Sequence, residues 1–438
     1  MPAIPPEILQ QFIEHISDPY TLKDCALAAS ILRQPAQKQL FRKLELGGEP
    51  GSYERFAARF SASQHAHLAL CVQELVIHLE YYPSSRKTTQ AVLQALATAG
   101  NSLRKCSIQG IYYKRRWDQA EPALLEELFA WLPASGIRDI EVVNALYVPP
   151  ATVYALLAMD GFASANFTNI TLDDPRFPWF KPSYSTDNFP PLTHELRDLT
   201  LYGAADIANL LIAPQFLPCV GSLRSLTLRY NMMAPSPTRP PLPSAFADIC
   251  AAASQTLVYL HFDDWLIQSN GESYAFLPAT LPRLKHFSLG TYSDSVSAGH
   301  DYSVRVEPLA DLIAAAFAPE RTPALETFTF HVVFTYTSSG IHEKFLRRID
   351  GIASARSSTC GKDVKVELKA TFMDNDADTV AGIADLAHAV GESMPEASAR
   401  GAVVVRDAEE TFFEGRFVPV DSVIEWVDSE STESSVSV

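Results

Sequence analysis

The chain has 438 residues, 47% of them hydrophobic and 20% charged, which excludes an intrinsically disordered protein and allows a large buried core. Its formal net charge of −16 disfavours a nucleic-acid backbone or an anionic membrane as the main partner. The sequence has no uninterrupted apolar stretch of about eighteen residues, and residues 1–10 lack the basic and apolar regions of a secretory signal. Together with widely spaced cysteines, these features predict an intracellular protein, cytoplasmic or nuclear.

Residues 3–46 are predicted to form three short helices. Pro5 and Pro6 suit the first turn of a helix, where the amide hydrogen that proline lacks would be unpaired anyway. One apolar face then follows at helical spacing, made of Ile8, Leu9, Phe12, Ile13 and Ile16. Thr21 can cap a second helix, and a third is expected over about 32–42. Three short helices have a marginal core, so the apolar face is either core or a surface left for a partner.

The same segment resembles the F-box. Ile4-Pro5-Pro6-Glu7-Ile8-Leu9 is similar to the opening of that motif, usually Leu-Pro-x-Glu-Ile/Leu-Ile/Leu. Its continuation in fungal-type F-box-like proteins is similar to Leu22…Cys25-Ala26-Leu27-Ala28…Ala36-Gln37…Leu40-Phe41. The sequence departs from the family pattern at Ser30, where a basic residue is usual, and at Leu32, where an aromatic residue is usual.

From residue 47 to 420 the sequence is dominated by a repeated apolar triplet, L-x-x-L-x-L. Its clear copies begin at Leu196, Leu223, Leu257, Leu284 and Leu325. Weaker copies begin at Phe41, Val72, Leu103, Ile137 and Phe167. A strand unit that returns about every thirty residues is typical of leucine-rich repeats.

Helical stretches lie between most of these triplets. The candidates are Gln90–Ala99, Pro122–Leu132, Thr152–Met159, Ala205–Leu211, Ala245–Ala253, Pro308–Phe317, His342–Ala355 and Thr379–Val390. One strand and one helix per repeat predicts an α/β fold, an irregular leucine-rich-repeat horseshoe (a solenoid) of roughly ten to twelve repeats. The uneven spacing and the missing Asn or Cys ladder residues make these repeats degenerate.

Three further segments interrupt or follow the repeats. The proline-rich stretches 173–191 and 234–243 are predicted to be loops, because proline neither donates to a strand ladder nor continues a helix. The first is also rich in aromatic residues and is either a lid over the edge of the horseshoe or a partner-recognition loop. Residues 421–438 form an acidic, Ser-rich tail that is predicted to be disordered.

The polar positions within each triplet are predicted to face away from the core, on the concave side of the horseshoe. They form either an interface with a target protein or an ordinary solvated sheet face. The side chains of the types most common in interface hot spots are Tyr202, Arg229, Tyr259, His261, Asp263, His286 and His331.

No catalytic signature is found, whether a nucleophile elbow, a phosphate-binding glycine loop or a zinc-protease motif. Asp374-Asn-Asp376-Ala-Asp378 opens like a calcium loop, but Thr379 stands where that loop needs glycine. Asp378 is predicted instead to cap a helix that begins at Thr379. The sequence therefore predicts a protein that is not an enzyme and that has no metal and no cofactor.

The F-box resemblance, ahead of a repeat array, implies the substrate-recognition subunit of a cullin-RING ubiquitin ligase. Residues 1–46 would bind the ligase adaptor, and the repeats at 47–420 would hold a target protein. At or beside the adaptor-binding face, the resemblance places Ile4, Pro5, Ile8, Leu9, Leu22 and Leu27. The alternative is a non-enzymatic leucine-rich-repeat binding or scaffold protein, in which the helices cap the array and recruit no ligase.

Overall fold

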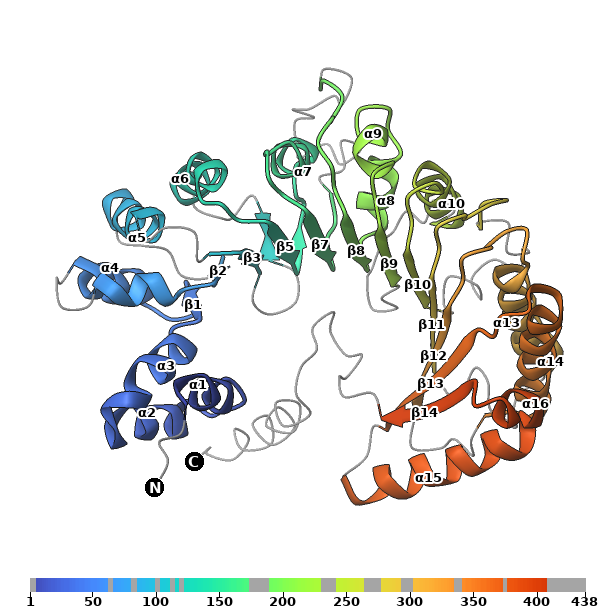
Figure 1. The fold of residues 1–438 in the computed structure, drawn as a ribbon. Coiled ribbons are helices and arrows are strands. Elements are labelled where there is room, and N and C mark those ends of the chain that lie inside the picture. The colour runs from blue at the N-terminus through green and yellow to red at the C-terminus, as the bar shows by residue number, and fades with distance from the viewer. Residues whose placement is uncertain are drawn as a thin grey trace, which may run out of the picture. The chain divides into compact units, whose positions relative to one another are not determined.

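The computed structural model describes twelve stretches of the chain: residues 5–61, 66–79, 85–98, 103–110, 115–117, 122–172, 189–229, 242–263, 277–292, 302–334, 341–372 and 376–407. The chain divides into two compact units, Met1–Cys219 and Val220–Val438. In both units parallel strands alternate with helices, as Figure 1 shows. No helix within the described stretches is long and apolar enough to cross a membrane.

The first unit opens with a helical module made of α1 (Pro6–Glu14), α2 (Pro19–Ala28) and α3 (Ser30–Leu40). Its buried core consists of Ile13, Leu22 and Ala36. The carboxylate of Asp18 caps α2 by accepting hydrogen bonds from the backbone amides of Tyr20 and Thr21. Three helices are therefore confirmed, but the predicted cap is wrong, because Asp18 caps α2 in place of Thr21.

Six strands follow the module and pair in parallel in chain order. They are β1 (Lys43–Leu46), β2 (Glu74–His78), β3 (Lys105–Gln109), β5 (Asp139–Val143), β7 (Ser164–Thr168) and β8 (Asp198–Tyr202). A short separate pair is formed by β4 (Arg115–Arg116) and β6 (Ala145–Leu146). The intervening helical segments are α4 (Ser52–Ser61), η1 (Ala66–Cys71), α5 (Arg86–Thr98), α6 (Pro122–Trp131), η3 (Leu132–Ala134), α7 (Pro150–Leu157), α8 (Ala205–Leu211) and α9 (Leu217–Val220). Because β1 already pairs with β2, the strands begin at residue 43, inside the segment 1–46 assigned to the helices.

The second unit repeats this alternation. Its strands β9 (Ser225–Arg229), β10 (Tyr259–Asp263), β11 (His286–Tyr292), β12 (Thr327–Phe334), β13 (Lys365–Phe372) and β14 (Val403–Asp407) are parallel neighbours in chain order. Its helices are α10 (Leu242–Ala252), α13 (Tyr302–Phe317), α14 (Glu343–Cys360), α15 (Asp376–Ser393) and α16 (Pro395–Ala399). The strands β13 and β14 extend the pattern beyond Leu325, the start of the last predicted triplet.

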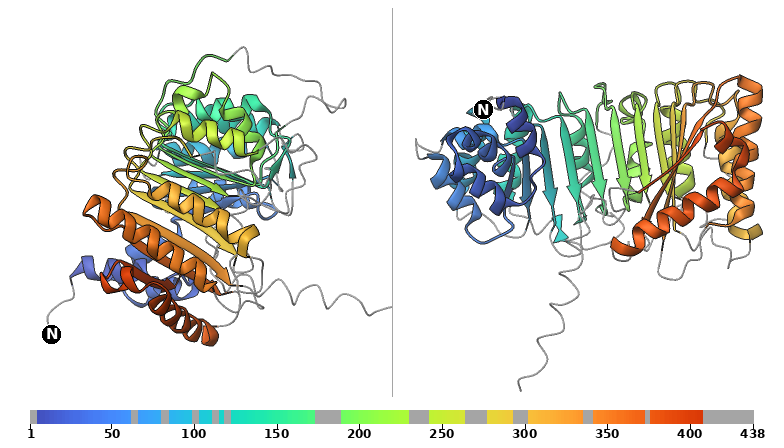
Figure 2. Two further views of the ribbon diagram at one scale, coloured as in Figure 1. Left: turned by 90° about the vertical axis from the view of Figure 1, so that its right-hand side faces the viewer. Right: turned by 60° about the horizontal axis from the view of Figure 1, so that its bottom comes forward.

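The strand register explains why the triplets recur. In the second unit the fourth letter of the triplet is aligned across neighbouring strands as Leu226, Leu260, Phe287 and Phe328. These side chains are buried, whereas alternate positions such as Thr227 lie on the opposite face. Helices α10, α13 and α14 run along the buried face, as Figures 1 and 2 show. The α/β prediction with parallel strands is confirmed.

The fifth triplet was predicted to begin at Phe167, and this register is wrong. Phe167 pairs with Val142 of β5 and Leu201 of β8, so it is the last apolar letter of its triplet. The triplet begins at the buried Phe162, with Ala165 in the middle. The small side chain of Ala165 hid the pattern, while Ile170 and Leu172 just beyond the strand imitated it.

A short asparagine ladder follows β5 and β7, although the sequence analysis found no such residues. Asn144 and Asn169 have left-handed backbones, with φ of 54° and 53°. Nδ2 of Asn169 donates to Oδ1 of Asn144 at 2.9 Å. Asparagine adopts this conformation more easily than most residues with a side chain. The wrong register of the fifth triplet concealed the ladder, because it placed Asn169 inside a strand.

The predicted helices are all present, with shifted ends. Only α8 has the predicted bounds, whereas α13 begins at Tyr302, six residues before the predicted start at Pro308. The helices α4, α9 and α16 were not predicted. Because α15 begins at Asp376, Asp378 lies inside its first turn, and the prediction that Asp378 caps the helix is wrong.

The interrupting loops and the tail lie mostly outside the described residues. Of the segment 173–191, the last three residues are described, and the ring of Phe189 stacks on Tyr154 of α7 with centroids 4.3 Å apart. The hydroxyl of Tyr154 also donates to the carbonyl oxygen of Pro190 at 2.9 Å. Residues 173–188, 230–241 and 408–438 are not among those described, so the lid, the partner-recognition loop and the disordered tail stay predictions. Of the second predicted loop, 234–243, Leu242 and Pro243 are described, and the loop prediction is wrong for these two because they begin α10.

Replacing Asp350 by alanine is expected to destabilise the second unit. Asp350 is buried in α14, and its carboxylate accepts hydrogen bonds from the backbone amides of Glu396 at 3.1 Å and Ala397 at 2.8 Å. Truncation leaves two amides of the first turn of α16 without this acceptor, which costs about 1–3 kcal/mol. Urea unfolding of both proteins measures the difference, and a change below about 0.5 kcal/mol would contradict this role.

Candidate interaction surfaces

The helical module leaves an unusual number of large apolar side chains in contact with solvent. They are Ile8 (53% exposed), Phe12 (66%), Tyr20 (75%), Leu27 (81%) and Ile31 (52%), and we call them the exposed apolar set. Only two other large hydrophobic residues in the described parts of the chain are exposed, Leu70 and Leu217. Single exposed apolar residues are ordinary, but five in one small module indicate a surface that a partner covers.

Helix geometry groups the members of this set. Ile8 and Phe12 are four residues apart and lie on one face of α1. On α2, Tyr20 and Leu27 are seven residues apart and so also share a face. Ile31 stands in the first turn of α3, only four residues after Leu27. Each helix of the module therefore presents at least one apolar side chain to solvent.

The residues that the F-box resemblance assigns to adaptor binding do not all have the same environment. Pro5, Ile8 and Leu27 are exposed, and Leu9 is half-buried. Leu22 belongs to the core of the module and is 3% exposed, so its side chain is not available to a partner. Ile4 lies outside the described residues.

Sequence reasoning left Phe12 open between core and surface, and it missed Tyr20 and Ile31 as surface residues. A signal was present for Phe12, because five apolar residues on α1 form a wider stripe than one small core can cover. Of these five, Ile13 is buried in the core and Ile16 packs against it. The sequence contained no comparable signal for Tyr20 and Ile31.

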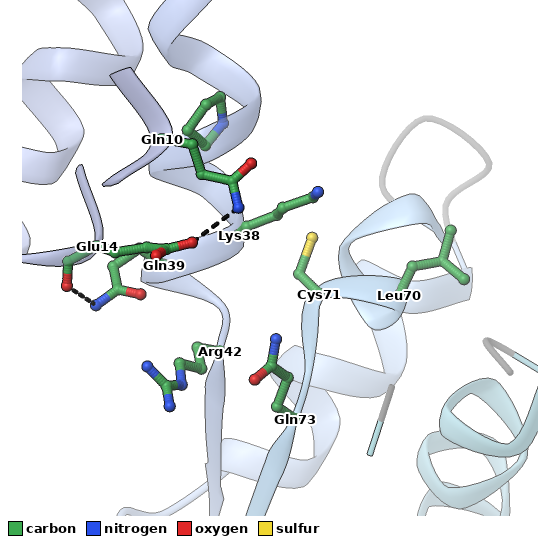
Figure 3. A pocket seen from close by; sticks show the side chains of 9 residues that line it. Gln10, Glu14, Lys38, Gln39, Arg42, Leu70, Cys71 and Gln73 are labelled. Carbon is green, nitrogen blue, oxygen red and sulfur yellow. Dashed lines mark hydrogen bonds between the residues drawn. The ribbon is translucent and has the colours of Figure 1, made fainter. Parts of the chain in front are cut away.

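A polar pocket of about 440 Å³ lies between the helical module and η1 (Figure 3). Glu14 lies on one side, held by a 2.8 Å hydrogen bond from Nε2 of Gln10, while Lys38 and Arg42 supply positive charge. Across the pocket stand Leu70 and Cys71 of η1. Burial raises the pKa of the Cys71 thiol, although the charge of Lys38 lowers it, so the group is held protonated and is a poor nucleophile. The pocket is therefore a gap beside the contact between α3 and η1, and its lining residues offer no evident chemistry.

The second unit carries a connected polar network on the strand face opposite its helices. Nδ1 of His261 lies 2.9 Å from Oγ of Ser288, and Nε2 lies 3.2 Å from Oδ1 of Asp263. Nε of Arg229 donates to Oδ2 of Asp263 at 3.3 Å. A Cβ atom at Gly290 would collide with Oδ1 of Asp263, so glycine at this position makes room for the carboxylate. The network thus fixes three neighbouring strands to one another through their side chains.

The combination of serine, histidine and aspartate here does not have the geometry of a catalytic triad. In a hydrolase the serine hydroxyl must reach a substrate, whereas Ser288 is 1% exposed. The contacts of the imidazole are also reversed, because the serine lies at Nδ1 and the carboxylate at Nε2. Every member of the network has a partner, so its evident role is to hold side chains on this face in fixed positions.

The seven residues predicted to bind a partner lie on strands of both units. Tyr202 belongs to the first unit, and the other six belong to the second. His286 is exposed, while Tyr202, Arg229, Tyr259, Asp263 and His331 are half-buried. His261 is 3% exposed, so it supports its neighbours and has almost no surface of its own. The structure brings Arg229, His261 and Asp263 into contact, which spacing alone did not predict.

The free energy of unfolding is expected to decrease as the pH is lowered, and His331 is one cause of this decrease. Burial, together with the positive charges of His261, Lys369 and Arg229, lowers the pKa of His331 to about 2. In the unfolded chain its pKa is near 6.5, so below that pH the unfolded state binds the extra proton and gains stability. The loss is about 1.4 kcal/mol per pH unit at most. A His331→Asn variant measured by urea unfolding at pH 7 and pH 5 should show a smaller decrease than the natural protein; equal decreases would contradict this assignment.

Comparisons with known proteins add no family to this picture. No protein-family model and no curated protein matches the sequence. Within the described residues, no group of three or more His, Cys, Asp or Glu side chains is arranged to hold a metal ion. The exposed apolar set and the strand faces are therefore the features of the described residues that bear on function.

Proposed function

We propose that this chain is the substrate-recognition subunit of a cullin-RING ubiquitin ligase, with an F-box-like helical module followed by a leucine-rich-repeat solenoid. The observation that carries the proposal is the exposed apolar set on a module that nevertheless has its own core. Leu27, which the F-box resemblance assigns to the adaptor face, is 81% exposed, and Ile8 is 53% exposed. Apolar burial on this scale contributes about 1.5–3 kcal/mol for each side chain that a partner covers fully.

Of the two departures from the F-box pattern, one lies in the interior of the module and the other beside the exposed apolar set. Leu32, which replaces the usual aromatic residue, packs against the core cluster of Ile13, Leu22 and Ala36. Its shape therefore affects how α1, α2 and α3 pack together. Ser30 is exposed at the start of α3, directly before Ile31, so a partner that covers Ile31 would lie close to it.

The proposed mechanism is proximity without bond chemistry in this chain. The module binds the ligase adaptor, and the polar strand faces bind a target protein. Both proteins are then held in one complex, which raises the effective concentration of target lysines near the charged conjugating enzyme. The strand faces suit such a role because neighbouring side chains are fixed by hydrogen bonds, which reduces the entropy lost on binding.

The rival function, a repeat protein whose helices only cap the array, is favoured by one contact. The module packs against the first repeat through α3 and η1. A cap needs such a contact, but a cap does not need five exposed apolar side chains on its other surfaces.

Co-purification of the full chain with the adaptor separates the two functions. The receptor proposal expects the natural chain to retain the adaptor and the Ile8→Glu variant to lose it. Leu70→Glu is a matched control, because Leu70 is also 53% exposed. It faces the pocket lined by Gln10 and Glu14, on the side of α1 opposite Ile8. If the folded natural chain retained no adaptor, the receptor proposal would be rejected and the capping function would remain.

A further inference from the structure

The strand faces of the two units differ in charge. In the second unit, the strand residues that point away from the helices include four cations, Arg229, Lys365, Lys369 and Arg406, and two carboxylates, Asp263 and Glu367. In the first unit they include two cations, Lys43 and Lys105, and five carboxylates, Glu45, Glu74, Asp139, Glu141 and Asp198. A positive face is unexpected in a chain with a net charge of −16.

Two of the four cations are already neutralised within the second unit. Arg229 pairs with Asp263 at 3.3 Å, and Nζ of Lys365 lies 2.5 Å from Oε1 of Glu367. Lys369 and Arg406 remain, and among the described residues neither has an ion-pair partner within 4.0 Å. They are directly opposite each other in the register of β13 and β14. Like charges opposite each other on neighbouring strands destabilise a sheet, so this pair is a cost that a bound anion would remove.

The charges of Lys369 and Arg406 affect the pKa values of neighbouring groups. Burial alone would raise the pKa of Glu367, but a hydrogen bond from Lys365 and the charges of Lys365, Arg406 and Lys369 lower it. A carboxylate placed on this face is therefore already stabilised in its charged form. The pKa of His331 is lowered by burial and also by the charges of His261, Lys369 and Arg229, so this imidazole stays neutral beside them.

We propose that Lys369 and Arg406 bind a carboxylate-rich segment, with closely spaced Asp or Glu residues, of the target protein. Lys369 is half-buried and Arg406 is exposed, so a segment lying across β13 and β14 at this pair can reach both. Adjacent strands are about 4.8 Å apart, a spacing that two nearby carboxylates of one peptide can match. A nucleic acid is a poorer fit, because proteins usually bind its phosphate backbone through many cations, whereas only two cations on the described strands of this face lack an ion pair. The inference rests on the proposed function only in calling the bearer of this segment the target.

The test is binding of a fluorescent decaglutamate peptide to the full chain, followed by anisotropy at low ionic strength. The natural chain should bind it, and Lys369→Glu/Arg406→Glu should weaken binding at least tenfold. The conservative exchange Lys369→Arg/Arg406→Lys should retain binding. Lys344→Glu/Arg347→Glu makes the same charge change on α14, on the helix side of the same unit, and should alter binding less than twofold.

Four results would overturn the inference. The first is that all variants bind the peptide equally, and the second is that a single-stranded oligonucleotide binds as tightly as the peptide. The third is that the peptide binds only after residues 408–438 are removed. The fourth is that the natural chain self-associates and the double variant Lys369→Glu/Arg406→Glu does not. The third would show that the chain's own acidic end occupies the site, and the fourth a second copy of the chain. Adaptor binding measured on the same samples keeps the two proposals separate, because Lys369→Glu/Arg406→Glu changes the second unit and leaves α1–α3 unaltered.

Discussion

Replacing Phe12 by alanine is expected to weaken adaptor binding about 30-fold, with almost no change in stability. Phe12 is 66% exposed, and Ile8, one turn away on the same face, is also exposed. Aromatic residues at the centre of an interface commonly contribute about 2 kcal/mol or more, which corresponds to that factor. An exposed side chain contributes little to folding, so the free energy of unfolding should stay within about 0.5 kcal/mol. Titration of the natural chain and the variant with the adaptor measures the difference.

Leu70→Ala is the control for this experiment. Leu70 has similar exposure but lies on η1, across the pocket from Gln10 and Glu14. Its truncation should leave adaptor affinity within twofold. If Phe12→Ala and Leu70→Ala had equal effects, the exposed apolar set would not be the binding surface.

Replacing Phe328 by alanine is expected to destabilise the second unit by about 3–5 kcal/mol. Phe328 is fully buried on β12 at the centre of an aromatic cluster. Its ring stacks on Phe287 at 5.9 Å and on Phe330 at 6.3 Å, and Phe317 of α13 meets it edge-on at 5.4 Å. Truncation loses the transfer free energy of the ring and leaves a cavity between the strands and α13.

Urea unfolding of Phe328→Ala and Phe12→Ala compares the same chemical change at a buried and at an exposed position. The first variant should lower the midpoint strongly and the second hardly at all. A loss below about 1 kcal/mol for Phe328→Ala would mean that the aligned aromatic rings are not a close-packed core. For adaptor binding the order is reversed: Phe12→Ala should weaken it strongly and Phe328→Ala hardly at all. The binding of Phe328→Ala has to be measured under conditions in which this variant is folded.

The repeating strands could be predicted because one apolar pattern served every copy. Leu226, Leu260 and Phe287 are equivalent residues in neighbouring strands, so each copy supported the interpretation of the others. The prediction failed where the pattern was carried by the small Ala165, since apolar residues outside the strand then gave a better local match. No feature of the sequence predicted the division of the chain into two units between Cys219 and Val220.

The candidate surfaces were harder to predict because exposure depends on what packs nearby. Ile8 and Ile13 belong to one apolar stripe in the sequence, yet Ile13 is 1% exposed and Ile8 is 53% exposed. Likewise, His261 has the position of a surface residue in its strand, but Ser288 and Asp263 from the same face enclose it. The opposed pair of Lys369 and Arg406 required the register of β13 and β14, because Arg406 lay beyond the last predicted triplet.

A calorimetric titration of the full chain with the purified adaptor tests the central claim most directly. The proposal predicts saturable one-to-one binding with a negative heat-capacity change, because apolar side chains such as Phe12 and Leu27 leave water. It also predicts that Ile8→Glu abolishes the heat of binding and that Leu70→Glu leaves it unchanged. A folded natural chain that produces no binding heat at several temperatures, and that does not co-elute with the adaptor, would contradict the proposal.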